Sequence, residues 1–189
     1  MIYVPTPLRV VDEMLEVARI HSGDVLYDLG CGDGRIVVEA AKRFGIKAVG
    51  IDIDPDRVSE ARENVQRAGV EGLVTIEQGD IFQMDLTPAS VITMYLLQGL
   101  DAALVPQLAK LSPGTRIVSH DWDIPGAIPD GHWTTTASFF GDYNEFFDPG
   151  APEDEAHYKQ VDHQVYLWVT PLKWEEQQLT PPGAVDRSL

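Results

Sequence analysis

The chain has 189 residues, of which 44% are hydrophobic, with a single cysteine and a formal net charge of −16. A chain of this length can bury enough apolar surface for one globular domain, and one cysteine excludes an intrachain disulfide, which favours a reducing, cytoplasmic compartment. The acidity argues against binding the phosphate backbone of a nucleic acid, although it leaves a cationic partner open. The sequence has neither a long apolar run that would cross a membrane nor the pattern of a secretory signal.

The hydrophobic pattern predicts alternating helices and strands over the first two thirds of the chain. Residues 7–20 are expected to form a helix with Thr6 as its N-cap and Pro7 at its first position. The clearest helix is predicted at 55–68, capped by Asp54 and ended by Gly69. The other helices are predicted at 34–44 and 101–111, and the strands at 24–30, 48–53, 73–80, 90–96 and 115–122. This alternation indicates an α/β fold with a mostly parallel sheet and helices on both faces.

The last third of the chain follows a different pattern. Residues 132–140 and 163–170 alternate polar and apolar side chains, which is typical of half-buried antiparallel strands. Between them, residues 141–162 carry seven acidic residues, one lysine and four aromatic residues. We expect this acidic aromatic insertion to gate a substrate or to join two subunits, with a solvated loop as the alternative. Residues 1–175 are predicted to form a single domain, and 176–189 a polar tail.

A glycine-rich loop, DLGCGDGR at 28–35, follows the first predicted strand. Ligands of open α/β sheets bind beyond the carboxyl ends of the strands, and glycines there let the backbone turn tightly beside the ligand. The G-x-G-x-G spacing is one residue shorter than the dinucleotide fingerprint, and the two aspartates would repel a pyrophosphate. A cationic or zwitterionic ligand is therefore favoured. Cys31 is expected to be a small packing residue rather than a nucleophile.

Two further acidic positions come at the ends of the next two strands. Asp52 can accept hydrogen bonds from both hydroxyls of a ribose, whereas the nearby Asp54 is better explained as a helix cap. Asp80 can accept from the exocyclic amine of an adenine, and Ile81 can pack on the ring. The carboxyl ends of three consecutive strands thus predict a nucleoside-containing ligand.

Together these three places resemble the S-adenosylmethionine site of class I methyltransferases over about residues 24–122. The resemblance implies a Rossmann-like fold, with a seven-stranded sheet whose C-terminal strand is antiparallel. It also implies an S-adenosylmethionine-dependent methyltransferase. The cofactor contacts that it implies are Asp28, Gly30, Gly32, Asp33 and Gly34 in the loop, Asp52 with Ile53 at the ribose, and Asp80 with Ile81 at the adenine.

Other stretches resemble a narrower group, which contains archaeal broad-specificity protein-lysine methyltransferases, mitochondrial lysine methyltransferases and bacterial relatives. They lie at 3–7, 28–36, 91–97, 112–122 and 163–169. In that group the segment before the first helix, within residues 1–22 here, closes over the cofactor. The resemblance therefore implies contacts from Tyr3, Pro5 and Thr6, with a rigid extended lead-in as the alternative. The insertion at 141–162 departs from the archaeal members, whose corresponding link is shorter, so the substrate could differ.

Transfer to a lysine requires an aligned and deprotonated amine. Neutralising an ordinary lysine at pH 7 costs roughly 4–5 kcal/mol, a cost that desolvation between aromatic walls lowers. We expect Tyr95 and Trp122, at the ends of the fourth and fifth strands, to be such walls, and His120 to orient the amine or accept its proton. The alternatives are an ordinary core tyrosine and a buried, satisfied histidine.

No metal site is predicted. The candidate ligands match no spacing typical of metal-binding proteins; they are His120, Asp121, Asp123, His157 and His163.

The expected function is N-methylation of protein lysine. A small-molecule methyltransferase with the insertion as its lid is the first alternative, and a non-catalytic binding module or assembly subunit the second. Nucleic-acid methylation is disfavoured, because the TMYLL segment at 93–97 lacks the Asn/Asp-Pro-Pro-aromatic tetrapeptide of amino-group DNA methyltransferases.

Overall fold

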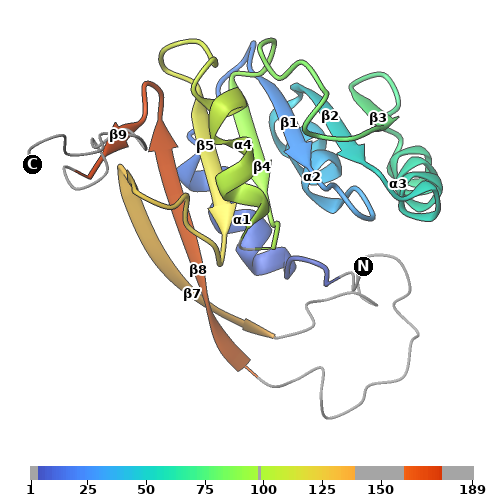
Figure 1. The fold of residues 1–189 in the computed structure, drawn as a ribbon. Helices are drawn as coiled ribbons and strands as arrows, with labels where there is room; N and C mark the ends of the chain where they lie inside the picture. The colour runs from blue at the N-terminus through green and yellow to red at the C-terminus, as the bar shows by residue number, and fades with distance from the viewer. Residues whose placement is uncertain (1–3, 98, 139–159, 176–189) are drawn as a thin grey trace, which may run out of the picture.

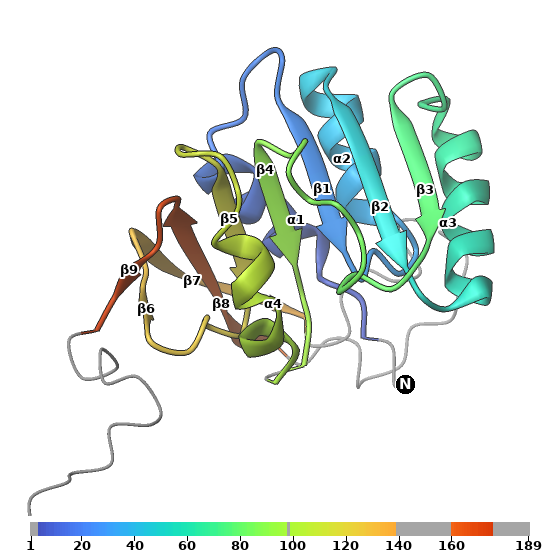
Figure 2. The same ribbon diagram turned by 45° about the horizontal axis from the view of Figure 1, so that its top comes forward.

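A seven-stranded sheet forms the centre of the computed structural model, which describes residues 4–97, 99–138 and 160–175 (Figures 1 and 2). Its strands are β1 (Val25–Leu29), β2 (Lys47–Asp52), β3 (Val74–Gln78), β4 (Val91–Met94), β5 (Arg116–His120), β7 (Gly131–Ser138) and β8 (Gln160–Val169). The order across the sheet is β3-β2-β1-β4-β5-β8-β7. The first five strands run parallel, and β8 is antiparallel to both of its neighbours. The predicted Rossmann-like methyltransferase fold is confirmed.

Helices cover both faces of this sheet, as predicted (Figure 1). They are α1 (Leu8–Val17), α2 (Arg35–Phe44), α3 (Pro55–Ala68) and α4 (Leu100–Leu108). Three of them, α1 to α3, pack on one face around Met14, Val38 and Val65, whereas α4 packs on the other through Leu104 and Leu108. Two hydrophobic cores therefore lie on opposite sides of the sheet and hold its strands in a fixed register.

Local signals place several helix ends as expected. Asp54 is the N-cap of α3 and accepts a hydrogen bond from the backbone N–H of Asp56 at 2.9 Å. Gly45 and Gly69 end α2 and α3 in the left-handed conformation, which is the usual role of glycine after a helix.

The start of α1 differs from the prediction. Pro7, not Thr6, is the N-cap, and no side chain caps this helix. The Thr6 hydroxyl instead lies 3.1 Å from Nδ1 of His120, a partner 114 positions away that the local sequence pattern cannot reveal.

The C-terminal part holds two further departures. Strand β8 already begins at Gln160, so residues 160–162 belong to the sheet rather than to the insertion. Residues 141–159 lie outside the described part of the chain. Strands β6 (Ala127–Ile128) and β9 (Lys173–Trp174) form a small second sheet that no sequence pattern indicated. Two-residue strands are too short to show an alternating pattern.

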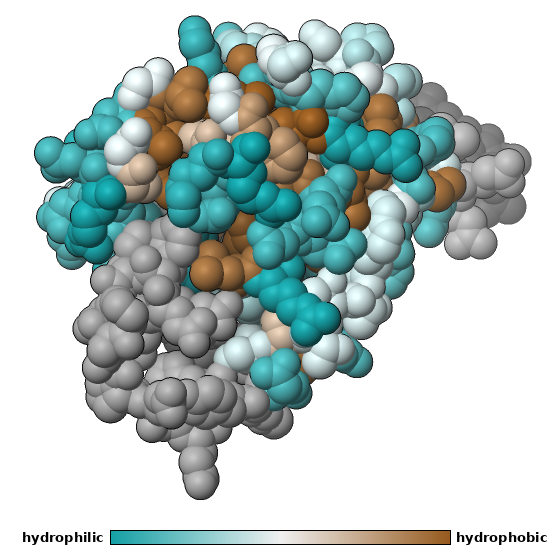
Figure 3. Space-filling model, turned by 180° about the vertical axis from the view of Figure 1, so that it is seen from behind, coloured by the Kyte–Doolittle hydropathy of each residue, from teal (hydrophilic) through white to brown (hydrophobic). Residues whose placement is uncertain are grey.

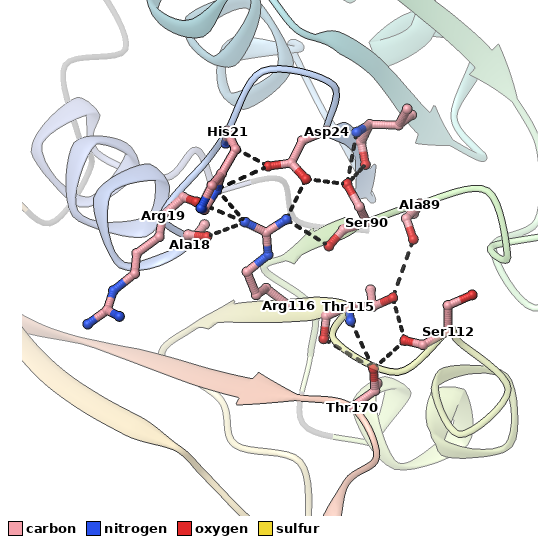
Figure 4. A network of polar contacts seen from close by, with 11 residues as sticks. Ala18, Arg19, His21, Asp24, Ala89, Ser90, Ser112, Thr115, Arg116 and Thr170 are labelled. Atoms are coloured by element: carbon pink, nitrogen blue, oxygen red, sulfur yellow. Dashed lines mark hydrogen bonds and ion pairs between the residues drawn. The ribbon is translucent and has the colours of Figure 1, made fainter.

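Arg116 lies at the start of β5, at the edge of the sheet that is opposite the glycine loop. Its side chain links several segments of the chain there (Figure 4). Its guanidinium donates to the carbonyls of Ala18 and Arg19 beyond α1, and to the carboxylate of Asp24 before β1. Burial by itself raises the pKa of Asp24, but hydrogen bonds from Arg116, His21 and Ser90 outweigh it and hold this pKa below its usual value. One side chain thus joins the end of α1 to two strands.

Hydrophilic side chains cover most of the face seen from behind, with hydrophobic ones in patches between them (Figure 3). No helix within the described residues is long and apolar enough to cross a membrane.

Candidate functional site

A cavity of about 850 Å³ opens at the carboxyl ends of the parallel strands, where the sequence predicts the site. It is lined from the segment before α1, from the glycine loop after β1 and from the loops after β2, β3, β4 and β5. The lining residues are 4–6, 28, 30, 31, 33, 35, 36, 52–57, 79–82, 95–97, 100 and 122.

Backbone contacts shape the glycine loop. The N–H groups of Gly30 and Cys31 both donate to the carbonyl of Ile51, which ties the loop to β2. Gly30 has a φ of +74°, and a Cβ there would lie 2.9 Å from a methyl group of Leu96. Gly34 has a φ of +81° and packs on Ala61 of α3, where an added Cβ would come within 3.1 Å. Both positions therefore require glycine for conformation and for space.

Gly32 and Gly34 do not line the cavity, although both were predicted to contact the cofactor. The N–H of Gly32 donates to the carboxylate of Asp52 at 2.9 Å. In this structure both glycines shape the loop. A direct contact of either residue with the cofactor stays a prediction.

Asp28 lines the cavity and is almost fully buried. Its pKa is raised to about 7, chiefly by burial and further by the carboxylates of Asp52 and Asp33, against a hydrogen bond of 2.7 Å from the Thr93 hydroxyl that lowers it. A carboxyl group with this pKa is ready to take a positively charged partner, which would restore its ionised form.

Cys31 has a raised pKa as well, because it is buried and then because the same three carboxylates surround it. Its thiol stays protonated at neutral pH, as suits the packing role that we predicted.

The loop also holds a fully buried ion pair. The guanidinium of Arg35 donates to both carboxylate oxygens of Asp33, with Nη2 at 2.6 Å. Its other terminal nitrogen donates to the backbone carbonyl of Thr6 at 2.9 Å. Arg35 therefore fastens the segment before α1 to the glycine loop, next to the cavity. Asp33 was predicted as a cofactor contact; it lines the cavity, but its carboxylate is engaged by Arg35.

The predicted nucleoside contacts all line the cavity. Both oxygens of Asp52 accept backbone N–H groups, from Gly32 at 2.9 Å and Asp54 at 3.0 Å, which fixes the carboxylate while leaving lone pairs for a ligand. Asp80 is held in the same way by the N–H of Phe82 at 3.0 Å. The structure brings Asp52, Ile53, Asp80 and Ile81 to the same cavity as Pro5, Thr6 and Asp28.

Of the three predicted catalytic residues, only Tyr95 and Trp122 line the cavity. Burial, followed by the nearby charge of Asp121, raises the pKa of Tyr95 to about 12, so its hydroxyl stays protonated. His120 is fully buried behind Tyr95, with the two ring centroids 3.9 Å apart. It does not line the cavity, which leaves the orienting or proton-accepting role without a described contact.

Tyr3, a predicted cofactor contact, lies outside the described residues. The sequence analysis missed several residues that line the cavity. Arg35 gave no signal, because its partner Thr6 is 29 positions away. Ile53, Phe82 and Leu97 are exposed large hydrophobic residues in the segments that follow β2, β3 and β4. Only Ile53 was predicted, although an exposed apolar residue at a strand end was the available signal for all three.

The fold, the G-x-G-x-G loop and the carboxylates after three successive strands define a class I, S-adenosylmethionine-dependent methyltransferase. Residues 28–131 match the family described as the ANTKMT methyltransferase domain, and the chain belongs to this family.

The relatives extend this assignment. A "Protein-lysine N-methyltransferase" of Saccharolobus islandicus is 49% identical over 129 residues, which are 67% of this chain and 80% of that protein. An "Adenine nucleotide translocase lysine N-methyltransferase" of Mus musculus is 33% identical over 65% of this chain, but the match spans only 54% of that protein.

Among solved structures, a protein of Salinibacter ruber, described as an RNA methyltransferase in complex with S-adenosyl-L-homocysteine, has a TM-score of 0.73. It is 43% identical, and the match covers 92% of this chain and 97% of the other.

Proposed function

We propose that this chain transfers a methyl group from S-adenosylmethionine to the side-chain amine of lysine in proteins. The observation that carries the proposal is that Tyr95 and Trp122 line the same cavity as the three carboxylates Asp28, Asp52 and Asp80. The identity of 49% to an archaeal protein-lysine N-methyltransferase over two thirds of the chain supports the choice of acceptor.

The residues present fit the cofactor. A cavity of about 850 Å³ is within the range of roughly 300–1,000 Å³ that small-molecule sites occupy. Asp28 and the glycine loop would hold the amino-acid part, Asp52 the ribose and Asp80 the adenine, with Ile53 and Ile81 against the rings. When bound, S-adenosylmethionine supplies an electrophilic methyl group on a sulfonium.

The chain's own part in the reaction is to bind, orient and exclude water. The ring of Tyr95 is held against buried His120, which fixes the tyrosine as one wall of the cavity. A lysine amine placed between Tyr95 and Trp122 loses water, and this desolvation lowers its pKa toward the neutral form that attacks. With a pKa of about 12, the Tyr95 hydroxyl remains a neutral hydrogen-bond donor or acceptor rather than a phenolate.

The acceptor is tested by incubating the chain with radiolabelled S-adenosylmethionine and a lysate separated into protein, RNA and small-molecule fractions. We expect label in protein, recovered as methyl-lysine after hydrolysis. Label confined to RNA would assign the chain the activity named for the Salinibacter ruber protein, and label confined to small molecules would favour the alternative function. The net charge of −16 speaks against RNA, because a phosphate backbone is attracted to basic surfaces.

Cofactor assignments are tested by calorimetry. Asp52→Ala should weaken S-adenosylmethionine binding at least tenfold, since hydrogen bonds to a charged group are worth about 1.5–3 kcal/mol. Asp85→Ala removes an exposed carboxylate in the loop after β3 that does not line the cavity, and it should bind as the natural chain does. Unchanged affinity in a folded Asp52→Ala protein would remove the ribose assignment.

The wall residues are tested by turnover. Alanine at Tyr95 or Trp122 should lower turnover far more than cofactor affinity, because the wall acts on the acceptor. Full turnover of both variants on the protein substrate would place the transfer pocket elsewhere.

We further propose that the acidic aromatic insertion at 141–162 contacts the substrate or a second subunit, and that the enzyme works in a reducing cytoplasm. Because residues 160–162 belong to β8, the test replaces only 142–159 by a Gly-Ser linker. S-adenosylmethionine binding should stay within a few-fold, while the substrate range or the mass seen by light scattering changes. Unchanged mass, substrates and rates would show that the insertion has neither role.

A further inference from the structure

Three potential metal ligands meet where β5 ends beside β8. They are Nε2 of His120, Oδ2 of Asp121 and Nδ1 of His163. The two histidine nitrogens are 2.9 Å apart, and each lies 3.3 Å from the Asp121 oxygen. Both histidines are buried, with exposed fractions of 0% and 3%. Sequence spacing did not indicate this group, because His163 joins His120 only through the antiparallel pairing of the two strands.

Hydrogen bonding can satisfy all three atoms only through one N–H that is shared between two acceptors. A neutral histidine carries one ring proton. If only His163 is protonated at Nδ1, the lone pairs of His120 Nε2 and Asp121 Oδ2 face each other. If only His120 is protonated at Nε2, the lone pairs of His163 Nδ1 and Asp121 Oδ2 do so. If both are protonated there, two N–H donors meet at 2.9 Å. Every arrangement leaves one like-with-like contact.

A second observation comes from the far side of His163. Its Nε2 is buried and has no hydrogen-bond partner among the described residues. A buried polar atom without a partner costs stability, and native structures retain few of them without a functional reason. Here the imidazole keeps its place although one nitrogen is unsatisfied, which indicates that the orientation of Nδ1 toward the triangle has a use.

Two sides of this triangle match a metal site in size, and the third, between the two histidine nitrogens, is shorter at 2.9 Å. Zinc bonds to histidine nitrogen and carboxylate oxygen are about 2.0–2.1 Å long, so two ligands of a tetrahedral ion lie about 3.3 Å apart. Two histidines and one carboxylate are also a common ligand set, which leaves one position open.

Outer contacts orient two of the three ligands, as they do at metal sites. Nδ1 of His120 is bonded to the Thr6 hydroxyl at 3.1 Å, and Oδ1 of Asp121 accepts the N–H of Gln164 at 2.8 Å. Asp121 has a φ of +60°, a left-handed conformation that is strained for a residue with a side chain. This strained backbone turns the carboxylate back toward the two histidines.

We propose that His120, Asp121 and His163 bind one divalent transition-metal ion, with zinc as its nearest chemical match. The ion joins β5 to β8 and, through Thr6, links them to the segment before α1, which lines the cavity. It is a structural ion, because His120 and His163 do not line the cavity.

The test is a zinc titration, followed by calorimetry, of tag-free protein stripped with a chelator. We expect one equivalent to bind with micromolar or tighter affinity. His163→Ala and Asp121→Asn should each weaken binding at least a hundredfold. His132→Ala removes an exposed histidine on β7 that also bonds to β8, and it should bind zinc as the natural chain does. An absence of binding, or an equal loss in all three variants, would overturn the proposal.

Two further measurements do not depend on folded variants. At zinc concentrations about a hundredfold above Kd, Tm of the natural chain should rise by about 5 °C or more. X-ray absorption of the zinc-loaded natural chain should show two imidazoles and oxygen at about 2.0 Å. A shell without imidazole, or an unchanged Tm, would show that the cluster is only a buried hydrogen-bonded group.

Discussion

Replacing Arg35 by methionine tests the buried ion pair beneath the glycine loop. Arg35 and Asp33 are 2% and 0% exposed, so the variant leaves a carboxylate buried without its partner charge. Removing one member of a buried pair costs about 3–5 kcal/mol. A chain of this size loses about 2–4 °C in Tm per kcal/mol, so Tm should fall by about 6–20 °C.

The assays are thermal unfolding, which gives Tm, and urea unfolding, which gives the free energy of unfolding. Both are monitored by circular dichroism. The control is Arg43→Met in the same helix, whose ion pairs with Asp12 and Glu16 are exposed and should cost less than about 1 kcal/mol. Adding Asp33→Asn to Arg35→Met removes the stranded charge and should restore part of the loss. If Arg35→Met costs no more than Arg43→Met, or if the double variant is as unstable as the sum of its parts, the buried pair is not what holds the loop.

Other variants test the remaining parts of the structure. Arg116→Met should cost about 2–3 kcal/mol in urea unfolding, because it removes charged hydrogen bonds to Asp24 and to two carbonyls; a cost below 0.5 kcal/mol would contradict the linking role of this side chain. Burial raises the pKa of Asp101 to about 7, and its two oxygens have no hydrogen-bond partner within the part of the chain that the structure describes. Because this folded pKa lies above the unfolded value, the natural chain loses stability as pH rises from about 4 to 7. Asp101→Asn should therefore be more stable by about 1–3 kcal/mol at pH 8, but not at pH 4; an equal gain at both would refute it. Gly34→Ala should cost about 1–2 kcal/mol, because φ is +81° and the methyl group meets Ala61; a neutral effect would show that α3 moves aside.

The local sequence pattern was sufficient to predict the sheet and the edge of the sheet at which the cavity lies. Short apolar runs and amphipathic stretches have characteristic periods, and Gly45, Gly69 and Asp54 act on their own backbone neighbours. Because parallel strands end at the same edge, the carboxylates after β2 and β3 could be brought together without coordinates. The two-stranded β6–β9 sheet could not be found in this way, since each strand has only two residues.

The sequence by itself determined the strand–helix alternation, the glycine loop and the positions of Asp52 and Asp80, because each depends on residues close together in the chain. Tertiary structure alone decided which partners the remaining polar groups took. The Thr6 hydroxyl bonds to His120 rather than capping α1, and His120 meets His163 through the pairing of β5 with β8. Such contacts join residues 43 to 114 positions apart. Folding brings these groups together and buries them, and burial removes the water that would otherwise bind them.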